Sequence, residues 1–278
     1  MATAKPIRIG NHQVGKGQPL YVLAGPCVLE DPDEMLRTAS EIAGICDRLG
    51  VGFCFKASYR KDNRTSSESY RGPGLVDGLE LLNRIGQEIG APVVTDIHHP
   101  DEAAAVAEVA EILQIPAFLC RQTSLLEAAG ATGKVVNIKK GQFLAAADMA
   151  HAAGKVESAG GDRILMTERG SFFGYRDLTV DFRSIKIMRD LGYPVVFDAT
   201  HSVQSPGSTG NTTGGNPELI PLLGRCGMAA GSDVLFVEAH PDPSRAMSDA
   251  GSQLPLASLE PLLTELVRYR NLTMESEA

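Results

Sequence analysis

Reactive or charged side chains stand at the ends of short apolar runs, where predicted strands end. Runs such as LYVLAGP, GFCF, VVNI and VLFV are each followed at once by such a residue. The residues at these positions are Cys27, Lys56, Asp96, His98, Gln114, Lys139, Arg169, His201 and Glu238. In a closed parallel barrel, the carboxyl ends of the strands form one rim that carries the chemistry. The pattern therefore predicts that these distant residues meet in one site.

Cations and neutral donors form a first group. Lys56, Lys139 and Arg169 directly follow predicted buried strands, and Lys61 and Arg64 come shortly after the second strand. Lys and Arg are the usual clamps for phosphate and carboxylate. The neutral donors are Ser58, Asn63, Ser66 and Gln114. The group favours two anionic substrates, or one with two anionic ends. For Lys61 and Arg64, a solvated surface charge stays open as an alternative.

A second group of side chains is suited to a divalent metal ion. Cys27, His201, Glu238 and Asp249 offer a thiolate, an imidazole and two carboxylates, which suit Zn, Fe(II) or Mn. Their spacing alone does not bring them together, but barrel closure makes the first, seventh and eighth strands neighbours. A buried thiol, a helix cap and a hydrogen-bonded histidine remain alternative interpretations. His240 is a rival ligand or a partner of one.

The elements that must position these residues alternate regularly along the chain. Eight apolar runs alternate with amphipathic segments at 33–50, 75–90, 101–110, 124–133, 146–160, 182–192, 217–231 and 256–270. Such alternation indicates a parallel α/β sheet, and eight repeats favour a (β/α)8 TIM barrel over an open sheet. No GxGxxG follows the first strand, which argues against a dinucleotide fold. We expect one domain over residues 1–278.

Two further features of this organisation concern the ends of the barrel. Residues from about 6 to 18 predict a short β-hairpin that covers the N-terminal mouth of the barrel. Two long glycine-rich connections, 56–74 and 201–218, follow the second and seventh strands. Long loops of this kind are usually functional, so both are expected to close over a substrate.

Composition narrows the classes of partner. A formal net charge of -8 argues against nucleic acid, whose phosphates need a basic face. No apolar stretch approaches the roughly 20 residues that span a bilayer, and the first residues lack a signal-peptide core. Five cysteines without framework spacing fit a reducing compartment. The sequence therefore predicts a cytoplasmic protein that binds small molecules and neither nucleic acid nor membranes.

Eight motifs, in order and over nearly the whole chain, resemble the 3-deoxy-D-manno-octulosonate 8-phosphate synthase family, also called 2-dehydro-3-deoxyphosphooctonate aldolase. The motifs are AGPCVLE (24–30), FKASYRKDNRTSSESYRGPG (55–74), TDIH (95–98), QIPAFLCRQT (114–123), VNIKKGQF (136–143), ERGSFFGY (168–175), VVFDATHSVQ (195–204) and VEAHPDP (237–243). The resemblance implies a (β/α)8 barrel, usually tetrameric, that joins phosphoenolpyruvate to arabinose 5-phosphate and releases phosphate. The product feeds lipopolysaccharide core synthesis.

The resemblance also implies roles for individual residues. Cysteine in the first-strand motif marks the metal-dependent branch, with Cys27, His201, Glu238 and Asp249 as ligands. The phosphoenolpyruvate site carries over to Lys56, Ser58, Gln114, Lys139 and Arg169. The pentose phosphate site carries over to Lys61, Asn63, Arg64 and Ser66. The chain departs from the family pattern in reading Ser-Asp-Ala-Gly-Ser around Asp249, where Asp-Gly-Pro is expected, and in Ala145, where proline is usual.

Several alternatives remain open within this interpretation. Lys56, Asp96, His98 and His201 are candidates for proton handling, without a ranking. The nearest rival activity is 3-deoxy-arabino-heptulosonate 7-phosphate synthase, which uses erythrose 4-phosphate, although KDNRTSS resembles the eight-carbon family more. A Schiff-base aldolase with Lys139 as nucleophile is a second rival. A non-catalytic sugar-phosphate sensor is the third.

Overall fold

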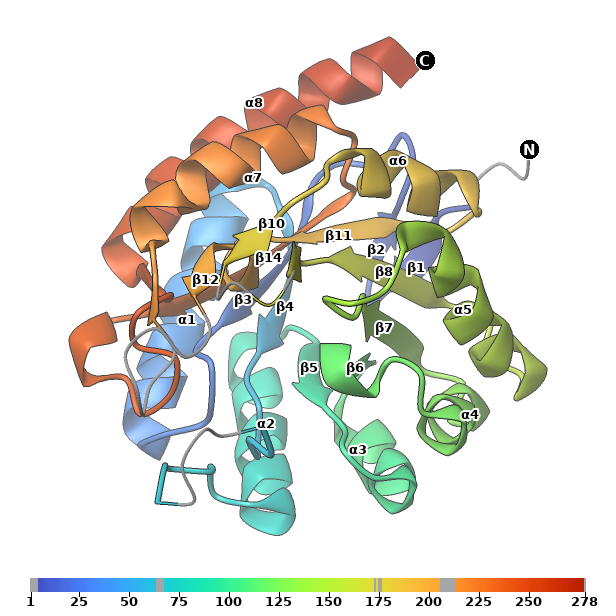
Figure 1. The fold of residues 1–278 in the computed structure, drawn as a ribbon. Helices are drawn as coiled ribbons and strands as arrows, with labels where there is room; N and C mark the ends of the chain where they lie inside the picture. The colour runs from blue at the N-terminus through green and yellow to red at the C-terminus, as the bar shows by residue number, and fades with distance from the viewer. Residues whose placement is uncertain (1–4, 64–67, 173, 175–176, 206–213, 278) are drawn as a thin grey trace.

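Eight parallel strands close into a barrel in the computed structural model, which describes residues 5–63, 68–172, 174, 177–205 and 214–277. Around the barrel the strands run β3, β4, β5, β6, β7, β8, β11 and β14, and β14 pairs with β3 to close it (Figure 1). Their bounds are Tyr21–Gly25, Gly52–Lys56, Val93–Asp96, Ile112–Ile115, Val135–Lys139, Ile164–Glu168, Val195–Asp198 and Val234–His240. The predicted (β/α)8 barrel is confirmed.

A helix follows each strand and packs on the outside of the barrel (Figure 1). The helices are α1 Pro32–Leu49, α2 Leu75–Ile89, α3 Ala103–Val109, α4 Thr123–Ala131, α5 Met149–Ser158, α6 Arg183–Asp190, α7 Ile220–Ala229 and α8 Leu259–Glu277. α1 shows the sequence signals directly, because Asp31 caps its start and Gly50 ends it in a left-handed conformation. α8 continues beyond the predicted end at 270, where no glycine stops it.

The N-terminal hairpin closes the barrel at the end opposite to the site. It consists of β1 Ile7–Ile9 and β2 His12–Val14, paired antiparallel. Its apolar side chains Ile7, Ile9 and Val14 join the cluster of residues that fills the inside of the barrel. The predicted hairpin and its position are confirmed. Arg270 of α8, fully buried, donates to the Gly15 and Gln18 carbonyls and so fixes the chain that leaves the hairpin.

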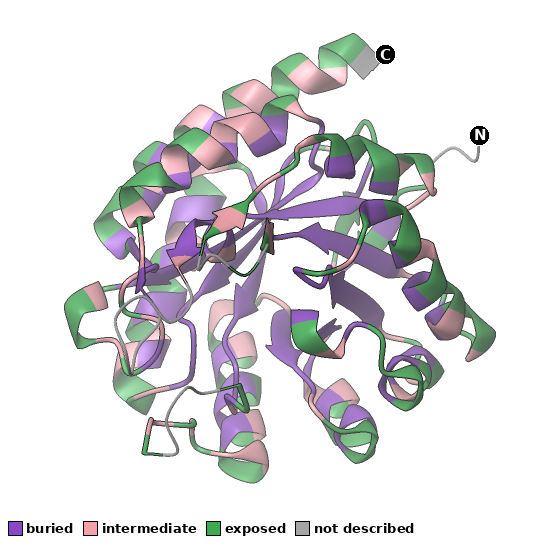
Figure 2. Ribbon diagram, viewed as in Figure 1, coloured by how far each residue is buried: buried purple, intermediate pink, exposed green. Residues whose placement is uncertain are grey.

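The strands are buried on both faces, as their continuous apolar sequences predict. On β3, Tyr21 and Leu23 belong to the cluster inside the barrel, whereas Val22 and Ala24 belong to the cluster between sheet and helices. Figure 2 shows the resulting core of buried strands within a ring of helices exposed on their outer faces. No helix of the described residues has the length and apolarity needed to cross a membrane.

Short ladders and turns organise the connections at the carboxyl end of the barrel. β9 Ser171–Phe172 pairs with β10 Leu178–Thr179, and β12 Gln204–Ser205 pairs with β13 Gly214–Gly215. The second ladder brings together the two described parts of the predicted loop 201–218; residues 206–213 lie outside the described residues. β15 Leu254–Pro255 adds to the end of β14 and anchors the segment that carries Asp249.

Candidate active site

Residues from β4, from β14 and from the segment after β3 meet at the carboxyl rim of the barrel. Lys56, at the end of β4, places its Nζ 2.5 Å from Glu238 Oε1 and donates to the Cys27 carbonyl at 3.0 Å. The approach of the two strands requires Gly25, whose φ is 155°. A Cβ at this position would lie 2.1 Å from the Lys56 carbonyl oxygen. Glycine thus permits the contact that brings the Cys27 segment against Lys56.

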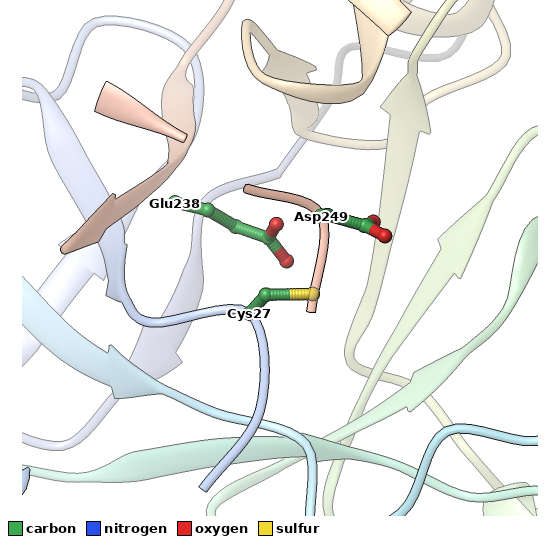
Figure 3. A group of neighbouring side chains, drawn as sticks. All are labelled: Cys27, Glu238 and Asp249. Atoms are coloured by element: carbon green, nitrogen blue, oxygen red, sulfur yellow. The ribbon is translucent and has the colours of Figure 1, made fainter. Parts of the chain in front are cut away.

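Three of the four predicted metal ligands gather in one cluster. Ligand atoms of Cys27, Glu238 and Asp249 all lie within 4.8 Å of one another, and Figure 3 shows these side chains meeting from three separate segments. Asp249 adopts a left-handed backbone with a φ of 49°, which aspartate tolerates better than most residues. A thiol near the beginning of the chain therefore does meet an acid near its end, as barrel closure predicts.

His201, the fourth predicted ligand, lies beside this cluster and not within it. Its Nε2 is 3.8 Å from Glu238 Oε1, while its Nδ1 is 2.9 Å from Asp198 Oδ2. Because Asp198 occupies Nδ1, Nε2 is the nitrogen directed toward Glu238. A carboxylate on the far nitrogen is the usual arrangement for a metal-binding histidine.

The donor set fits a borderline divalent cation. Glu238 Oε2 is buried and has no hydrogen-bond partner among the described residues. Burial, and then the nearby Asp249 and Glu238 carboxylates, raise the pKa of Cys27 to about 12. Burial and the nearby carboxylates keep the Cys27 thiol protonated. A cation that binds the sulfur would displace this proton. Thiolate, carboxylate and imidazole ligands together suit Zn, Fe(II) or Mn.

The loop that holds Asp249 is anchored by residues that sequence reasoning did not single out. Gln253 accepts from the Cys27 amide at 3.2 Å and donates to the Ser248 carbonyl at 2.8 Å. The Cys27 thiol in turn donates to Ser248 Oγ at 3.2 Å. Although the sequence lacks the expected Asp-Gly-Pro, the loop is held directly against the Cys27 segment.

A buried guanidinium and a buried ammonium group lie next to the cluster. Arg169 is 4% exposed; its Nη2 donates to Gln204 Oε1 at 3.3 Å, but its Nε and Nη1 find no partner among the described residues. Lys139 is 5% exposed, and its Nζ lies 2.7 Å from Asp198 Oδ2. Burial lowers the pKa of both groups, and the surrounding carboxylates oppose this effect. Unsatisfied buried donors on Arg169 mark a place for an anion.

Lys61 is buried, so the alternative that it is a solvated surface charge is wrong. Only 8% of it is exposed. Burial acts to lower the pKa of Lys61, but the surrounding Cys27, Glu238 and Asp96 outweigh it and raise the pKa. The charges that act on Lys61 therefore include those of predicted metal ligands, Cys27 and Glu238 among them.

Asp96 is the acceptor at the centre of the neutral donors. Ser58 Oγ donates to Asp96 Oδ2 at 2.6 Å, and Gln114 Nε2 donates to Asp96 Oδ1. Burial acts to raise the pKa of Asp96, but Lys61 and Lys56 outweigh it and hold the pKa well below its usual range. Asp96 is thus an ionised acceptor at neutral pH.

The remaining predicted residues are placed differently. His98 packs edge-on against Tyr59, and its Nδ1 lies 4.0 Å from Glu102 Oε2 without a hydrogen-bond partner among the described residues. Burial lowers the pKa of His98. Asn63 is exposed, and Arg64 and Ser66 lie outside the described residues.

His240 Nδ1 accepts from the Asp242 amide at 3.0 Å while Nε2 faces Glu30. These contacts place His240 as a partner of the loops and not as a ligand.

Two residues of the site escaped the sequence prediction. Asp198, which fixes both Lys139 and His201, ends the apolar run VVF and would have been found by the same strand-end rule. Gln204 Nε2 donates to Asp249 Oδ2 at 3.0 Å and connects Arg169 to Asp249. No local sequence signal distinguishes Gln204 from an ordinary loop glutamine.

Comparison with known proteins places this site in a family. A sequence model described as the DAHP synthetase I family matches residues 4–275. The chain belongs to the DAHP synthetase I family. The chain is 53% identical to the 2-dehydro-3-deoxyphosphooctonate aldolase of Desulfatibacillum aliphaticivorans, over 94% of this chain and 96% of that protein. A protein of the same name from Cyanothece sp. is 54% identical, over 92% of this chain and 94% of its own length. Another from Nitratidesulfovibrio vulgaris is 56% identical, over 88% of this chain and 90% of its own length. The shared name of these relatives confirms the resemblance inferred from the eight motifs.

Proposed function

We propose that the protein condenses phosphoenolpyruvate with arabinose 5-phosphate and water to give 3-deoxy-D-manno-octulosonate 8-phosphate and inorganic phosphate. The observation that carries the proposal is the buried Arg169 guanidinium with unpartnered Nε and Nη1, beside Lys139 and the Cys27, Glu238 and Asp249 cluster. The shared name of relatives at 53–56% identity supports the same reaction.

The charges of the site favour anionic substrates together with a divalent cation. Four cations stand against four carboxylates among the described residues: Lys56, Lys61, Lys139 and Arg169 against Asp96, Asp198, Glu238 and Asp249. A divalent cation that displaces the Cys27 proton would leave this set net positive. Such a set of charges suits phosphoenolpyruvate, which carries both a carboxylate and a phosphate.

In the proposed reaction, C3 of phosphoenolpyruvate attacks the aldehyde carbon of the pentose, and positive charge develops at C2. Water adds at C2, and the resulting phosphohemiketal releases phosphate by cleavage of the C–O bond. Arg169 and Lys139 hold the carboxylate and phosphate of phosphoenolpyruvate and fix its distance from the aldehyde. Lys56, Ser58 and Gln114 complete this site, and Lys61, Asn63, Arg64 and Ser66 receive the pentose phosphate.

We assign the divalent cation to Cys27, Glu238 and Asp249, with Nε2 of His201 as the fourth ligand. When bound, it would supply Lewis-acid polarisation and a template for the substrates. Asp198 holds His201 Nδ1 and thereby sets the tautomer that leaves Nε2 available. The low pKa of Asp96 makes it an acceptor that orients the neutral donors. His98 is the candidate for proton transfer, because both ring nitrogens of His201 are engaged when His201 binds the cation.

We also propose a cytoplasmic homotetramer that serves lipopolysaccharide core synthesis. Phe118 and Phe143, each 55% exposed, support an interface, because large aromatic side chains on the surface often mark contacts between subunits. Sedimentation velocity measures the assembly directly. A monomer at micromolar concentration would contradict the tetramer and leave the proposed reaction untouched.

The decisive experiment measures phosphate release from phosphoenolpyruvate with arabinose 5-phosphate or erythrose 4-phosphate as the acceptor. We expect release with the pentose, loss of release after chelation, and recovery on adding Zn²⁺, Mn²⁺ or Fe²⁺. Preference for erythrose 4-phosphate would favour the seven-carbon reaction instead. Borohydride trapping tests for a Schiff base on Lys139, and no adduct is expected.

A matched pair of variants tests whether the site performs the reaction. Lys139→Met removes a buried cation of the site, and Lys186→Met removes an ammonium from a surface ion pair whose side chain is 73% exposed. We expect phosphate release to fall by a factor on the order of 100 or more in Lys139→Met only. Equal rates in the two variants would place the chemistry elsewhere.

A further inference from the structure

A chain of hydrogen bonds crosses the inside of the barrel and ends at Asp96. Thr167 Oγ1 donates to Asn137 Oδ1 at 2.6 Å, and Asn137 Nδ2 donates to Gln114 Oε1 at 2.9 Å. Gln114 Nε2 then donates to Asp96 Oδ1. Every donor points toward Asp96, so each bond polarises the next in the same direction. We call these residues the Asp96 chain.

The strand register brings the members of the Asp96 chain together. Asp96 and Gln114 are partners across β5 and β6, and Gln114 and Asn137 are partners across β6 and β7. Thr167 follows on β8, the next strand around the barrel. All four residues are at most 7% exposed, so water does not replace a missing bond easily.

The direction of the chain is fixed at its charged end. An ionised carboxylate only accepts hydrogen bonds, so the nitrogen of the Gln114 amide must face Asp96. The oxygen of the same amide then faces Asn137, which must present its own nitrogen. Reversing the Gln114 amide would set its oxygen against the Asp96 carboxylate and its nitrogen against the Asn137 nitrogen. Asp96 at the nitrogen and Asn137 at the oxygen therefore hold the Gln114 amide together in a single orientation.

This orientation leaves one donor of Gln114 for a ligand. An amide nitrogen carries two hydrogens, and Asp96 is its acceptor for one of them. Among the described residues, the hydrogen bond to Asp96 is the one that Gln114 Nε2 makes. We propose that Asn137 is a positioning residue for substrate binding, which holds the second Nε2 hydrogen of Gln114 toward the anionic group of phosphoenolpyruvate. The inference rests on the proposed function and names a residue outside the predicted site.

The test combines substitutions of Asn137 and Gln114 and measures phosphoenolpyruvate binding by calorimetry. Asn137→Leu keeps the size of the side chain but removes the donor. We expect it to weaken phosphoenolpyruvate binding about tenfold, as the loss of one orienting hydrogen bond implies, with the KM for arabinose 5-phosphate changed less than about threefold. In a Gln114→Leu background, the same substitution should change binding less than about twofold, because its effect passes through Gln114.

Controls separate positioning from general damage. Urea unfolding establishes that each variant folds, and Asn137→Ala, which is smaller and also lacks the donor, replaces Asn137→Leu if the latter fails. Thr167→Val removes only the outer bond, so its effect on binding should be smaller than that of Asn137→Leu. Unchanged binding in a folded Asn137 variant, or an undiminished tenfold loss in the Gln114→Leu background, would overturn the inference.

The same measurements keep the inference apart from the proposed function. If the wild-type protein binds phosphoenolpyruvate but releases no phosphate with either aldose, the proposed reaction is wrong while the calorimetric cycle still decides the role of Asn137. If the wild-type protein does not bind phosphoenolpyruvate, both are wrong.

Discussion

The state of the Cys27 thiol predicts how metal affinity depends on pH. Its pKa of about 12 means that the thiol is protonated at neutral pH when no cation is bound. A cation that binds the sulfur as a thiolate must displace this proton. Five pKa units separate pH 7 from about 12, and at about 1.4 kcal/mol per unit the displacement costs about 7 kcal/mol.

This cost falls as the solution becomes more basic. Each pH unit removes about 1.4 kcal/mol, so the apparent affinity for Zn²⁺ should rise about tenfold per unit between pH 7 and 9. Glu238 adds little to the slope, since its pKa is about 2. Over the two units the expected gain is about a hundredfold.

Competition with a chromophoric chelator, calibrated at each pH, measures the apparent affinity. Cys27→Ser should bind Zn²⁺ more weakly and lose the slope, because a serine hydroxyl does not ionise in this range. Cys46→Ala removes another buried cysteine, on α1 and away from the cluster, and should keep the slope. Zn²⁺ affinity that does not change with pH in the wild-type protein, or a full slope in Cys27→Ser, would refute the reasoning.

Three further predictions concern stability. Asp96, Asp198 and Glu238 all have a pKa held below the usual range, so their stabilising contribution is present above about pH 4.5 and is lost as the pH falls toward 2. The urea concentration at the midpoint of unfolding should therefore decrease from pH 5 to pH 3. A constant midpoint would contradict the lowered pKa values. Arg270→Met should lower the free energy of unfolding by about 3 kcal/mol, because it removes a buried ion pair partner of Asp233, while the exposed Arg268→Met should have little effect. Gly25→Ala should destabilise the protein far more than Gly17→Ala, because a Cβ at position 17 would meet no atom within 4 Å. Urea unfolding measures both variants. Similar losses of unfolding free energy would show that the close approach of Gly25 to Lys56 is unimportant.

The sequence predicts the barrel well because its strands are buried on both faces. Such strands appear as continuous apolar runs, and caps such as Asp31 and Gly50 set the bounds of helices between them. The ladders β9–β10 and β12–β13 could not be predicted, since two residues are too few for any periodic pattern. The extension of α8 to Glu277 was missed because polar residues at its end give no signal of their own.

The candidate site is predictable in outline for the same reason that the barrel is. Strand ends define the rim, so Cys27, Lys56, Lys139 and Glu238 are found by position alone. Which of these side chains contact one another cannot be found from position alone, because the contacts depend on the rotamer that each buried side chain adopts. His201 illustrates the difference: its Nδ1 contacts Asp198, three residues earlier, and this contact determines which nitrogen faces Glu238.

Buried charges are costly, and the way this barrel satisfies them indicates where ligands belong. Lys56 is paired with Glu238 and Lys139 with Asp198, so these charges are compensated within the protein. Arg169 Nε and Nη1 and Glu238 Oε2 are not satisfied by any described residue. Buried donors and acceptors are seldom left without a partner in folded proteins. At this rim the unpartnered Arg169 donors favour an anion beside Arg169, and the unpartnered Glu238 oxygen favours a cation beside Glu238.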